Sequence, residues 1–311
     1  MVLLMKKISS HNTHSKVYED GAEDFLDKLF SEKNELNISQ NISELLANNP
    51  TWPILYHLSP QRHMILEWYP FKADSTIFEI GAGCGAITGL LCKRARKLFA
   101  NELDKKRARI IKNRFSDHDN LEVIQSNFQK IIPAKYLSDY VISIGVLEYS
   151  GKYMTPDSSE LFSSFQQYLI ACKRLIKPNG KLILAIENKI GLKYLSGMNE
   201  DHYSLRFESL ENYPHYNGIY TFTKSELDQL FLHAGYSDLR YYYPFPDYKL
   251  PNLILNEEGF DLNISTSSFA KIEDYSHKDA PLFNEIILAD NLRKSKLISF
   301  FSNSFLVEAS I

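Results

Sequence analysis

The chain has 311 residues, of which 44% are apolar and 23% charged, an ordinary composition for a globular core that excludes an intrinsically disordered chain. Its net charge of −3 at pH 7 argues against a general nucleic-acid binder, which usually carries a basic face. Three cysteines without Cys-x-x-Cys spacing make a disulfide framework or a zinc site unexpected, and a cytoplasmic location fits them.

The N-terminal region, residues 1 to about 50, is polar and rich in Asn and Ser. Its apolar run at 1–5 is too short for a signal peptide or a membrane span. Helical spacing predicts short helices at 22–30 and 42–47. We therefore expect an N-terminal helical or loosely ordered segment at 1–50, followed by one domain at 51–311.

Residues 75–104 are the stretch around which the chain is organised. A short apolar run predicts a buried strand, and three glycines follow it at alternate positions, Gly81, Gly83 and Gly85. Glycine permits positive φ and lets a ligand touch the backbone. A helical pattern and a second strand then end at Glu102, where a carboxylate about 20 residues after the glycines can accept hydrogen bonds from a ribose. This spacing predicts a cofactor that contains a nucleoside.

Strand and helix patterns alternate through the following residues, which predicts a parallel sheet with helices on both faces. The predicted strands lie at 121–124, 139–147, 181–187 and 238–245, and the predicted helices at 105–115, 158–176 and 224–234. Thr223 followed by Glu226 forms a capping box at the start of the last helix. Basic residues cluster at 93–97 and 105–109, and we interpret them as solvated helix faces.

The spacing of the glycine turn distinguishes between two cofactor classes. A dinucleotide site has Gly-x-Gly-x-x-Gly, whereas here Ala86 follows the third glycine and the pattern Glu-x-Gly-x-Gly-x-Gly begins at Glu79. This turn resembles the first motif of class I S-adenosylmethionine (SAM) methyltransferases. The resemblance implies SAM as cofactor and a Rossmann-like α/β fold with a seven-stranded, mostly parallel sheet whose antiparallel last strand lies at 305–308. Two insertions, 188–220 and 247–300, would then form a lid over the acceptor.

The resemblance also assigns cofactor contacts by position. Glu102 would hold the ribose hydroxyls, and Leu103 and Phe128 would sandwich the adenine, although core packing is the plainer interpretation of both. Asn127 would accept a hydrogen bond from the adenine amine, at a position where members usually have Asp. Arg62 would bind the SAM carboxylate, and a helix cap at the surface is an equal interpretation of it. The remaining assigned contacts are Glu79, Gly81, Gly83, Gly85 and Gly145.

Several segments of the second half resemble a narrower group, the methyltransferase domains found beside or fused to glycosyltransferases of surface-polysaccharide synthesis. These segments are ENKIGLKY at 187–194, EDH at 200–202, YTFTKSEL at 220–227 and YYPFPDYKLP at 242–251. The resemblance implies O-methylation of a sugar or glycan intermediate, a glycosyltransferase as partner, and no nucleic-acid partner. An RNA or protein methyltransferase and a non-catalytic SAM-binding module of a glycan assembly enzyme stay open as alternatives. Because no Asn-Pro-Pro-Tyr or Asp-Pro-Pro-Tyr follows the fourth strand, methylation of an adenine or glutamine amine is disfavoured.

Methyl transfer to a hydroxyl needs an aligned acceptor and a base near the ends of the fourth and fifth strands. His202 is the first candidate, oriented by Glu200 or Asp201, and Glu148 and Glu187 come next. A charged surface loop is an equal interpretation of the EDH segment. Asp201 and His202 lack a third ligand at recognisable spacing, so we expect no metal. If the insertions cover the acceptor, the tyrosines of the sixth strand and of the turn after it should face the cofactor.

Overall fold

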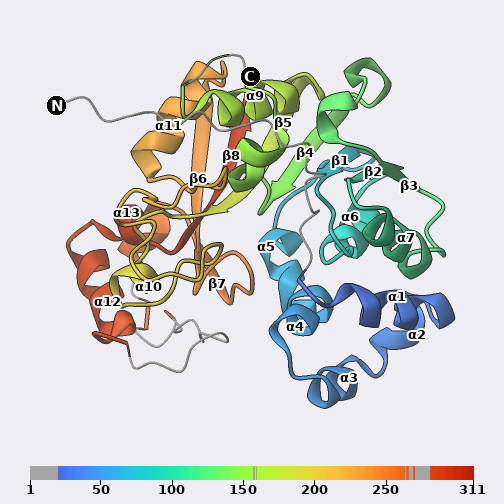
Figure 1. The fold of residues 1–311 in the computed structure, drawn as a ribbon, viewed down its shortest axis with the longest axis horizontal. Helices are drawn as coiled ribbons and strands as arrows, with labels where there is room; N and C mark the ends of the chain where they lie inside the picture. The colour runs from blue at the N-terminus through green and yellow to red at the C-terminus, as the bar shows by residue number, and fades with distance from the viewer. Residues whose placement is uncertain (1–19, 157, 159, 263, 266–268, 270–280) are drawn as a thin grey trace.

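The structure is a computed structural model that describes residues 20–156, 158, 160–262, 264–265, 269 and 281–311. The described residues form an eight-stranded sheet in the order β3-β2-β1-β4-β5-β8-β6-β7 (Figure 1). The strands are β1 (Thr76–Ile80), β2 (Lys97–Glu102), β3 (Leu121–Gln125), β4 (Ser138–Ile144), β5 (Ile176–Glu187), β6 (Asp238–Phe245), β7 (Leu253–Leu255) and β8 (Ser304–Ser310). Strands β1 to β5 pair in parallel. The expected Rossmann-like sheet is confirmed, with the short β7 added at one edge.

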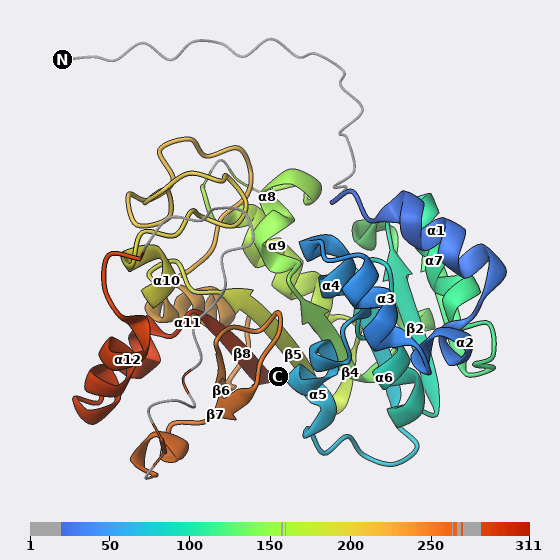
Figure 2. The ribbon, with the colours of Figure 1, turned by 90° about the horizontal axis from the view of Figure 1, so that it is seen from below.

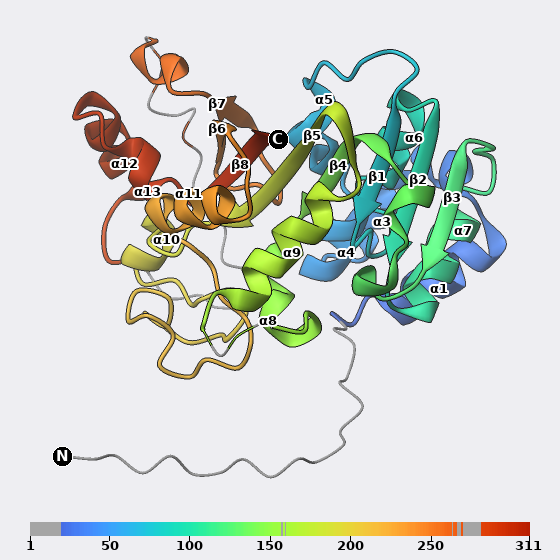
Figure 3. The same cartoon turned by 90° about the horizontal axis from the view of Figure 1, so that it is seen from above.

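Helices cover both faces of this sheet. They are α1 (Glu23–Glu32), α2 (Glu35–Ser39), α3 (Ile42–Asn48), α4 (Trp52–Leu58), α5 (Met64–Glu67), α6 (Thr88–Arg94), α7 (Lys105–Arg114), α8 (Ser150–Tyr153), α9 (Ser163–Lys173), α10 (Leu192–Leu195), α11 (Lys224–His233), α12 (Glu285–Lys294) and α13 (Ile298–Phe301). Side chains alternate faces along a strand, so Phe78 packs in the cluster with α9 and α11, whereas Ile77 packs in the cluster with α5 and α6. Helices α12 and α13 lie at the opposite end of the molecule from β3 and α7 (Figure 3). Among the helices of the described residues, none combines the length and apolarity that a bilayer crossing requires.

Strand β8 confirms the antiparallel strand expected at 305–308. It lies between β5 and β6, where Val307 pairs with Leu184 on one side and with Tyr241 on the other. All but the last of its residues are buried. The chain therefore adds β7 at the edge of the sheet after β6 and returns to the sheet interior only at β8.

Two of the three tyrosines of β6 pack in the protein interior. Tyr241 and Tyr243 are buried against Phe305 of β8, and Tyr242 lies on the other face beside Trp68. The expectation that this strand faces the cofactor is wrong, because strand neighbours alternate faces and both faces of β6 are covered by other side chains.

Helices α1 and α2 pack on α7 (Figure 2) through ion pairs. Arg107 of α7 is buried, and its Nε donates to Glu23 of α1 at 3.0 Å. Arg114 is also buried, and its Nε donates to Glu35 of α2 at 2.6 Å. The interpretation of the second basic cluster as a solvated face is therefore wrong for Arg107. Residues 1–19 of the expected N-terminal segment, and 263, 266–268 and 270–280 of the second insertion, lie outside the described residues.

Candidate active site

A cavity of about 460 Å³ opens at the carboxyl ends of the parallel strands. The last residues of β1, β2, β4 and β5 line it, namely Ile80, Glu102, Ile144 and Glu187. Segments from both insertions, 198–202 and 247–249, line it too. Ligands of open α/β sheets bind at this edge, so the cavity lies where the sequence predicts the cofactor and the acceptor.

Two glycines bring bare backbone to the cavity wall. Gly81 has φ +64°, and a Cβ there would lie 2.7 Å from Cγ2 of Val146. Gly145 has φ +71°, and a Cβ there would lie 2.7 Å from the hydroxyl of Tyr248. A side chain fits at neither position, because the space and the backbone conformation both exclude it.

The other two predicted glycines differ in what they face. Gly83 lines the cavity with positive φ. Gly85 is not among the lining residues, and a Cβ there would lie 2.6 Å from the ring of Phe115. Gly85 therefore allows the turn to approach α7 closely, and its assignment as a cofactor contact has no support from its position.

The predicted ribose and adenine contacts line one part of the cavity together. The carboxylate of Glu102 accepts hydrogen bonds from the backbone amides of Gly83 and Asp104, both at 2.8 Å. Burial raises the pKa of Glu102. Asn127 caps a short 3₁₀ helix, its Oδ1 accepting from the amide of Gln129 at 2.9 Å. The carboxylate and the amide oxygen thus have fixed positions and lone pairs left for a nucleoside.

Leu103 and Phe128 also lie on this part of the cavity wall. Both are partly exposed, and the ring of Phe128 packs 5.3 Å from that of Tyr168. Core packing alone does not account for two partly exposed side chains at a cavity, so their assignment to adenine stays a prediction consistent with their placement.

Glu79 lies beneath the glycine turn and also lines the cavity. Burial raises its pKa to about 8, and the hydroxyl of Thr88 donates to its Oε2 at 2.7 Å. The side chain therefore carries a proton at neutral pH and can donate a hydrogen bond into the cavity as well as accept one.

Arg62 joins the N-terminal side of the cavity to the second insertion. Its Nη1 donates to the carbonyls of Tyr248 at 2.7 Å and Lys249 at 2.8 Å, and its Nη2 donates to the hydroxyl of Tyr56 at 2.9 Å. The side chain is buried. Arg62 is thus neither a surface residue nor a helix cap; it holds the turn at 247–249 against α4, and its binding of the SAM carboxylate stays a prediction.

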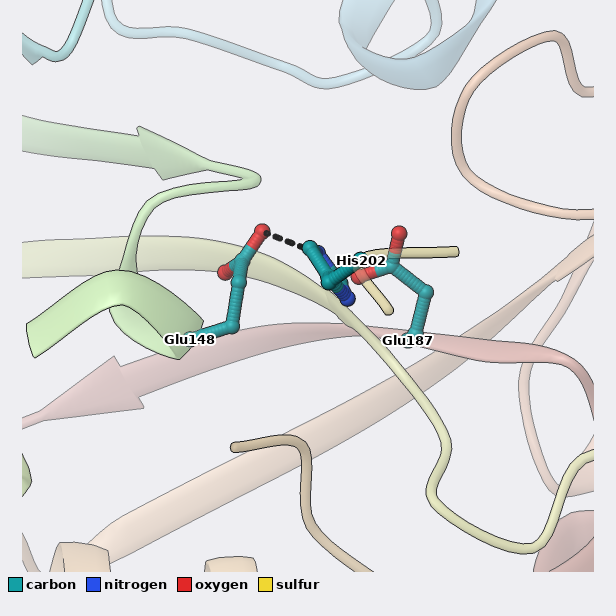
Figure 4. A group of neighbouring side chains, drawn as sticks. All are labelled: Glu148, Glu187 and His202. Atoms are coloured by element: carbon teal, nitrogen blue, oxygen red, sulfur yellow. Dashed lines mark ion pairs between the residues drawn. The ribbon is translucent and has the colours of Figure 1, made fainter. Parts of the chain in front are cut away.

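Three of the candidate bases, Glu148, Glu187 and His202, lie close together in the interior (Figure 4). Nδ1 of His202 donates to Oε1 of Glu200 at 2.8 Å, and its Nε2 lies 3.9 Å from Oε1 of Glu148. The carboxyl groups of Glu148 and Glu187 are buried, and the His202 side chain is 5% exposed. The interpretation of the EDH segment as a surface loop is wrong for Glu200 and His202, which face inward.

Asp201 belongs to a different set of contacts. Its Oδ2 accepts from Lys193 at 2.5 Å and lies 3.0 Å from Nζ of Lys249, which also pairs with Glu187 at 2.6 Å. Burial alone would raise the pKa of Asp201, but the two lysine charges outweigh it and hold that pKa below its usual value. Glu200 therefore orients His202, and Asp201 holds the lysines.

His202 and Glu148 differ in the pKa that their surroundings give them, and this difference assigns them different roles. Burial alone would lower the pKa of His202, but the charge of Glu200 and its hydrogen bond outweigh burial and raise it. Burial raises the pKa of Glu148 to about 7, against the lowering effect of His202. Of the two groups, Glu148 is the one that can take up a proton near neutrality.

Sequence reasoning missed the lysines, whereas Tyr248, the tyrosine of the turn after the sixth strand, lines the cavity as expected. Lys249 lines the cavity, and the hydroxyl of Tyr248 donates to Glu187 at 3.1 Å. Lys193 lies behind Asp201. Lys249 stands two residues after Asp247 in the turn at 245–251. Its contact with Glu187 at the end of β5 is between residues far apart in the sequence, so no local pattern indicates it.

Two sequence comparisons relate the chain to enzymes that modify ribosomal RNA. Residues 53–170 match the family described as ribosomal RNA adenine dimethylase. The "Ribosomal RNA small subunit methyltransferase A" of Koribacter versatilis is 23% identical over 230 residues, which cover 72% of this chain and 75% of that protein. The protein of the same name from Mycoplasma capricolum is 30% identical over 132 residues, 42% of this chain and 46% of that one. The chain thus spans about half of the Mycoplasma protein's length.

Solved structures with a similar course of the chain are methyltransferases. A phosphoethanolamine N-methyltransferase from Haemonchus contortus has a TM-score of 0.47 at 9% identity and covers 96% of this chain and 51% of that one. A SAM-dependent methyltransferase from Aquifex aeolicus has a TM-score of 0.40 at 17% identity, over 64% and 88%. Scores below 0.5 identify no substrate.

These relatives overturn the expectations about the acceptor. A sugar or glycan acceptor, a place in polysaccharide biosynthesis and the exclusion of nucleic acid all conflict with relatives named for ribosomal RNA. The segments that suggested a glycan begin at residue 187, beyond the matched 53–170. The net charge misled because it describes the whole surface and not the site. The family match, the glycine turn and the parallel sheet together support a class I fold that uses SAM as methyl donor. The chain is a SAM-dependent methyltransferase.

Proposed function

We propose that the chain methylates RNA, with the exocyclic amine of an adenine as acceptor, which replaces the expectation drawn from the lack of Asn-Pro-Pro-Tyr or Asp-Pro-Pro-Tyr after the fourth strand. The observation that carries this proposal is the family match over residues 53–170, because it includes the cofactor turn, the adenine contacts and Glu148. The relatives from Koribacter and Mycoplasma, which bear names of ribosomal RNA methyltransferases, support the same acceptor class.

Aromatic side chains of the cavity suit a base that has left its stack. Tyr149 and Tyr248 line the cavity, as do Trp52 and Tyr56 of α4. Enzymes that act on a base take it out of the helix and hold it between aromatic or apolar side chains. Stacking on an aromatic ring contributes about 1–3 kcal/mol per base. These side chains can therefore stabilise a flipped adenine without contacts to the neighbouring bases.

The proposed chemistry assigns the proton to Glu148. SAM supplies an electrophilic methyl group on a positively charged sulfur. As the amine nitrogen forms its bond to the methyl carbon and the carbon–sulfur bond breaks, the nitrogen becomes acidic and loses one proton. The carboxylate of Glu148 accepts a hydrogen bond from the amine and then this proton, while the neighbouring His202 ring keeps the carboxylate oriented. This role replaces the sequence-based expectation of His202 as the base.

A labelling experiment tests the acceptor. The chain is incubated with SAM that carries a tritiated methyl group and with small-subunit ribosomal RNA free of prior methylation, and the RNA is digested to nucleosides. We expect label in N6-methylated adenosine, and none when a synthetic RNA without adenine replaces the substrate. Equal labelling of the adenine-free RNA, or no RNA labelling by a chain that binds SAM, would overturn the proposal.

A further inference from the structure

We infer that Glu148, Glu187 and His202 form a binding site for one divalent transition-metal ion, with Mn²⁺ and Zn²⁺ as the fitting probes. The residues come from the ends of β4 and β5 and from the first insertion (Figure 4). Each offers one ligand atom, and these atoms lie within 4.8 Å of one another. Metal–ligand bonds of about 2.0–2.2 Å place ligand atoms about 3–4.4 Å apart around an ion, so movements of less than about 1 Å close the site.

Unpartnered oxygens give a second, independent observation. Oε2 of Glu148 and Oε2 of Glu187 are both buried and have no hydrogen-bond partner within the part of the chain that the structure describes. The residues are 1% and 0% exposed. A buried carboxylate oxygen without a partner costs free energy, and a cation bound between the two side chains would remove this cost.

The orientation of His202 also matches a metal ligand. Its Nδ1 is held by Glu200 at 2.8 Å, while Nε2 faces Glu148 at 3.9 Å, beyond hydrogen-bond distance. A histidine that binds a metal almost always gives its other ring nitrogen to a carboxylate or carbonyl, which fixes the tautomer. Glu200 supplies this second contact.

Carboxylates outnumber the basic side chains in the ion pairs of the described residues around the site. Glu148 and Glu200 pair with His202, and the separate set of Glu187, Asp201 and Asp247 pairs with Lys193 and Lys249. Lys249 pairs with Oε1 of Glu187 and leaves Oε2 available. Mixed carboxylate and imidazole ligands suit Mn²⁺ and Zn²⁺, and the open positions of the ion would take water or an oxygen of the acceptor.

Binding of the ion is tested without RNA, so the result does not depend on the proposed acceptor. Metal-free chain is titrated with Mn²⁺ or Zn²⁺ by calorimetry, and bound metal is counted after dialysis. We expect one equivalent in the wild-type chain, and at least about tenfold weaker binding in Glu187→Gln and in His202→Ala. SAM affinity, measured on each variant, reports whether the pocket is folded.

A matched control comes from a similar pair outside the cavity. His215 contacts Glu208 through Nδ1 at 2.8 Å, but its side chain is 69% exposed. His215→Ala should keep one equivalent of metal at unchanged affinity. In addition, the Mn²⁺ electron spin resonance signal should carry nitrogen coupling from one imidazole, absent in His202→Ala.

Two outcomes would overturn the inference. One is that the wild-type chain binds no more Mn²⁺ or Zn²⁺ than a variant with Glu148→Gln, Glu187→Gln and His202→Ala combined. The other is that the nitrogen coupling persists in His202→Ala. Metal binding together with absent RNA labelling would instead leave the metal site standing and remove only the proposed acceptor.

Discussion

At the scale of single residues, Glu102 carries the cofactor assignment. Its carboxylate is held by two backbone amides at the end of β2, so it presents its remaining lone pairs in a fixed direction. Glu102→Ala should weaken SAM binding by about 1.5–3 kcal/mol, which is about 10- to 150-fold. Calorimetry with SAM measures this, with Glu122→Ala as control, since Glu122 is 43% exposed on the next strand. Equal SAM affinity in the two variants would assign the ribose to another residue.

Glu148 gives the reaction its expected pH dependence. Its raised pKa of about 7 means that the acid form, which cannot accept a proton, dominates below pH 7. In a chelating buffer, kcat/KM should therefore rise about tenfold per pH unit below 7 and level off above about pH 8. The rates are measured at RNA concentrations well below KM, so that the profile reports the pKa of Glu148 in the free enzyme. A rate that is flat or falls between pH 6 and 8 would contradict this assignment.

At the scale of elements, the contact of α1 with α7 supports the cofactor site. Arg107 lines the cavity and is buried beside Glu23. Glu23→Ala leaves the guanidinium of Arg107 without the carboxylate of Glu23 and should destabilise the fold by about 3–5 kcal/mol. Asp27→Ala removes the exposed pair with Arg109 from the same helix and should cost less than about 1 kcal/mol. Urea denaturation compares the two variants, and similar losses would mean that α1 contributes no buried ion pair.

At the scale of the whole molecule, β8 joins the two halves of the sheet. Both of its edges pair, with β5 on one side and β6 on the other, and its side chains enter both core clusters. A chain that ends at residue 303 should therefore lose its cooperative unfolding transition and its SAM binding. Circular dichroism during heating and calorimetry with SAM check this. A truncated chain that unfolds cooperatively and binds SAM would show that β8 is dispensable.

Most of the sheet could be predicted from the sequence because the signals of its parallel strands are local. The apolar runs of β1 and β4, the glycine turn and the capping box at Thr223 each depend on neighbouring residues, and all were predicted. The strand at 305–308 came from the resemblance rather than from any local pattern. The second insertion was the weak point, because nothing within it indicates that Lys249 meets Glu187 at the end of β5.

The site was predicted only in part, because some of its positions follow from local signals and others do not. Placement of Glu102 and Asn127 follows from the order of the strands, whereas the division of work between Glu200 and Asp201 depends on which way each neighbour points. Adjacent residues of a loop have no fixed alternation, so the sequence left both open. The acceptor was wrong because segments that identify a relative do not identify what it methylates.

Turnover of Glu148→Gln tests most directly whether methyl transfer to RNA takes place at the cluster of Glu148, Glu187 and His202. The amide has the size of the carboxyl group but cannot accept a proton. Initial rates of label transfer from SAM to the RNA are measured for both proteins, together with SAM affinity. We expect a loss of about 100-fold or more in kcat, with SAM affinity changed less than about twofold. Wild-type turnover in the variant would contradict it.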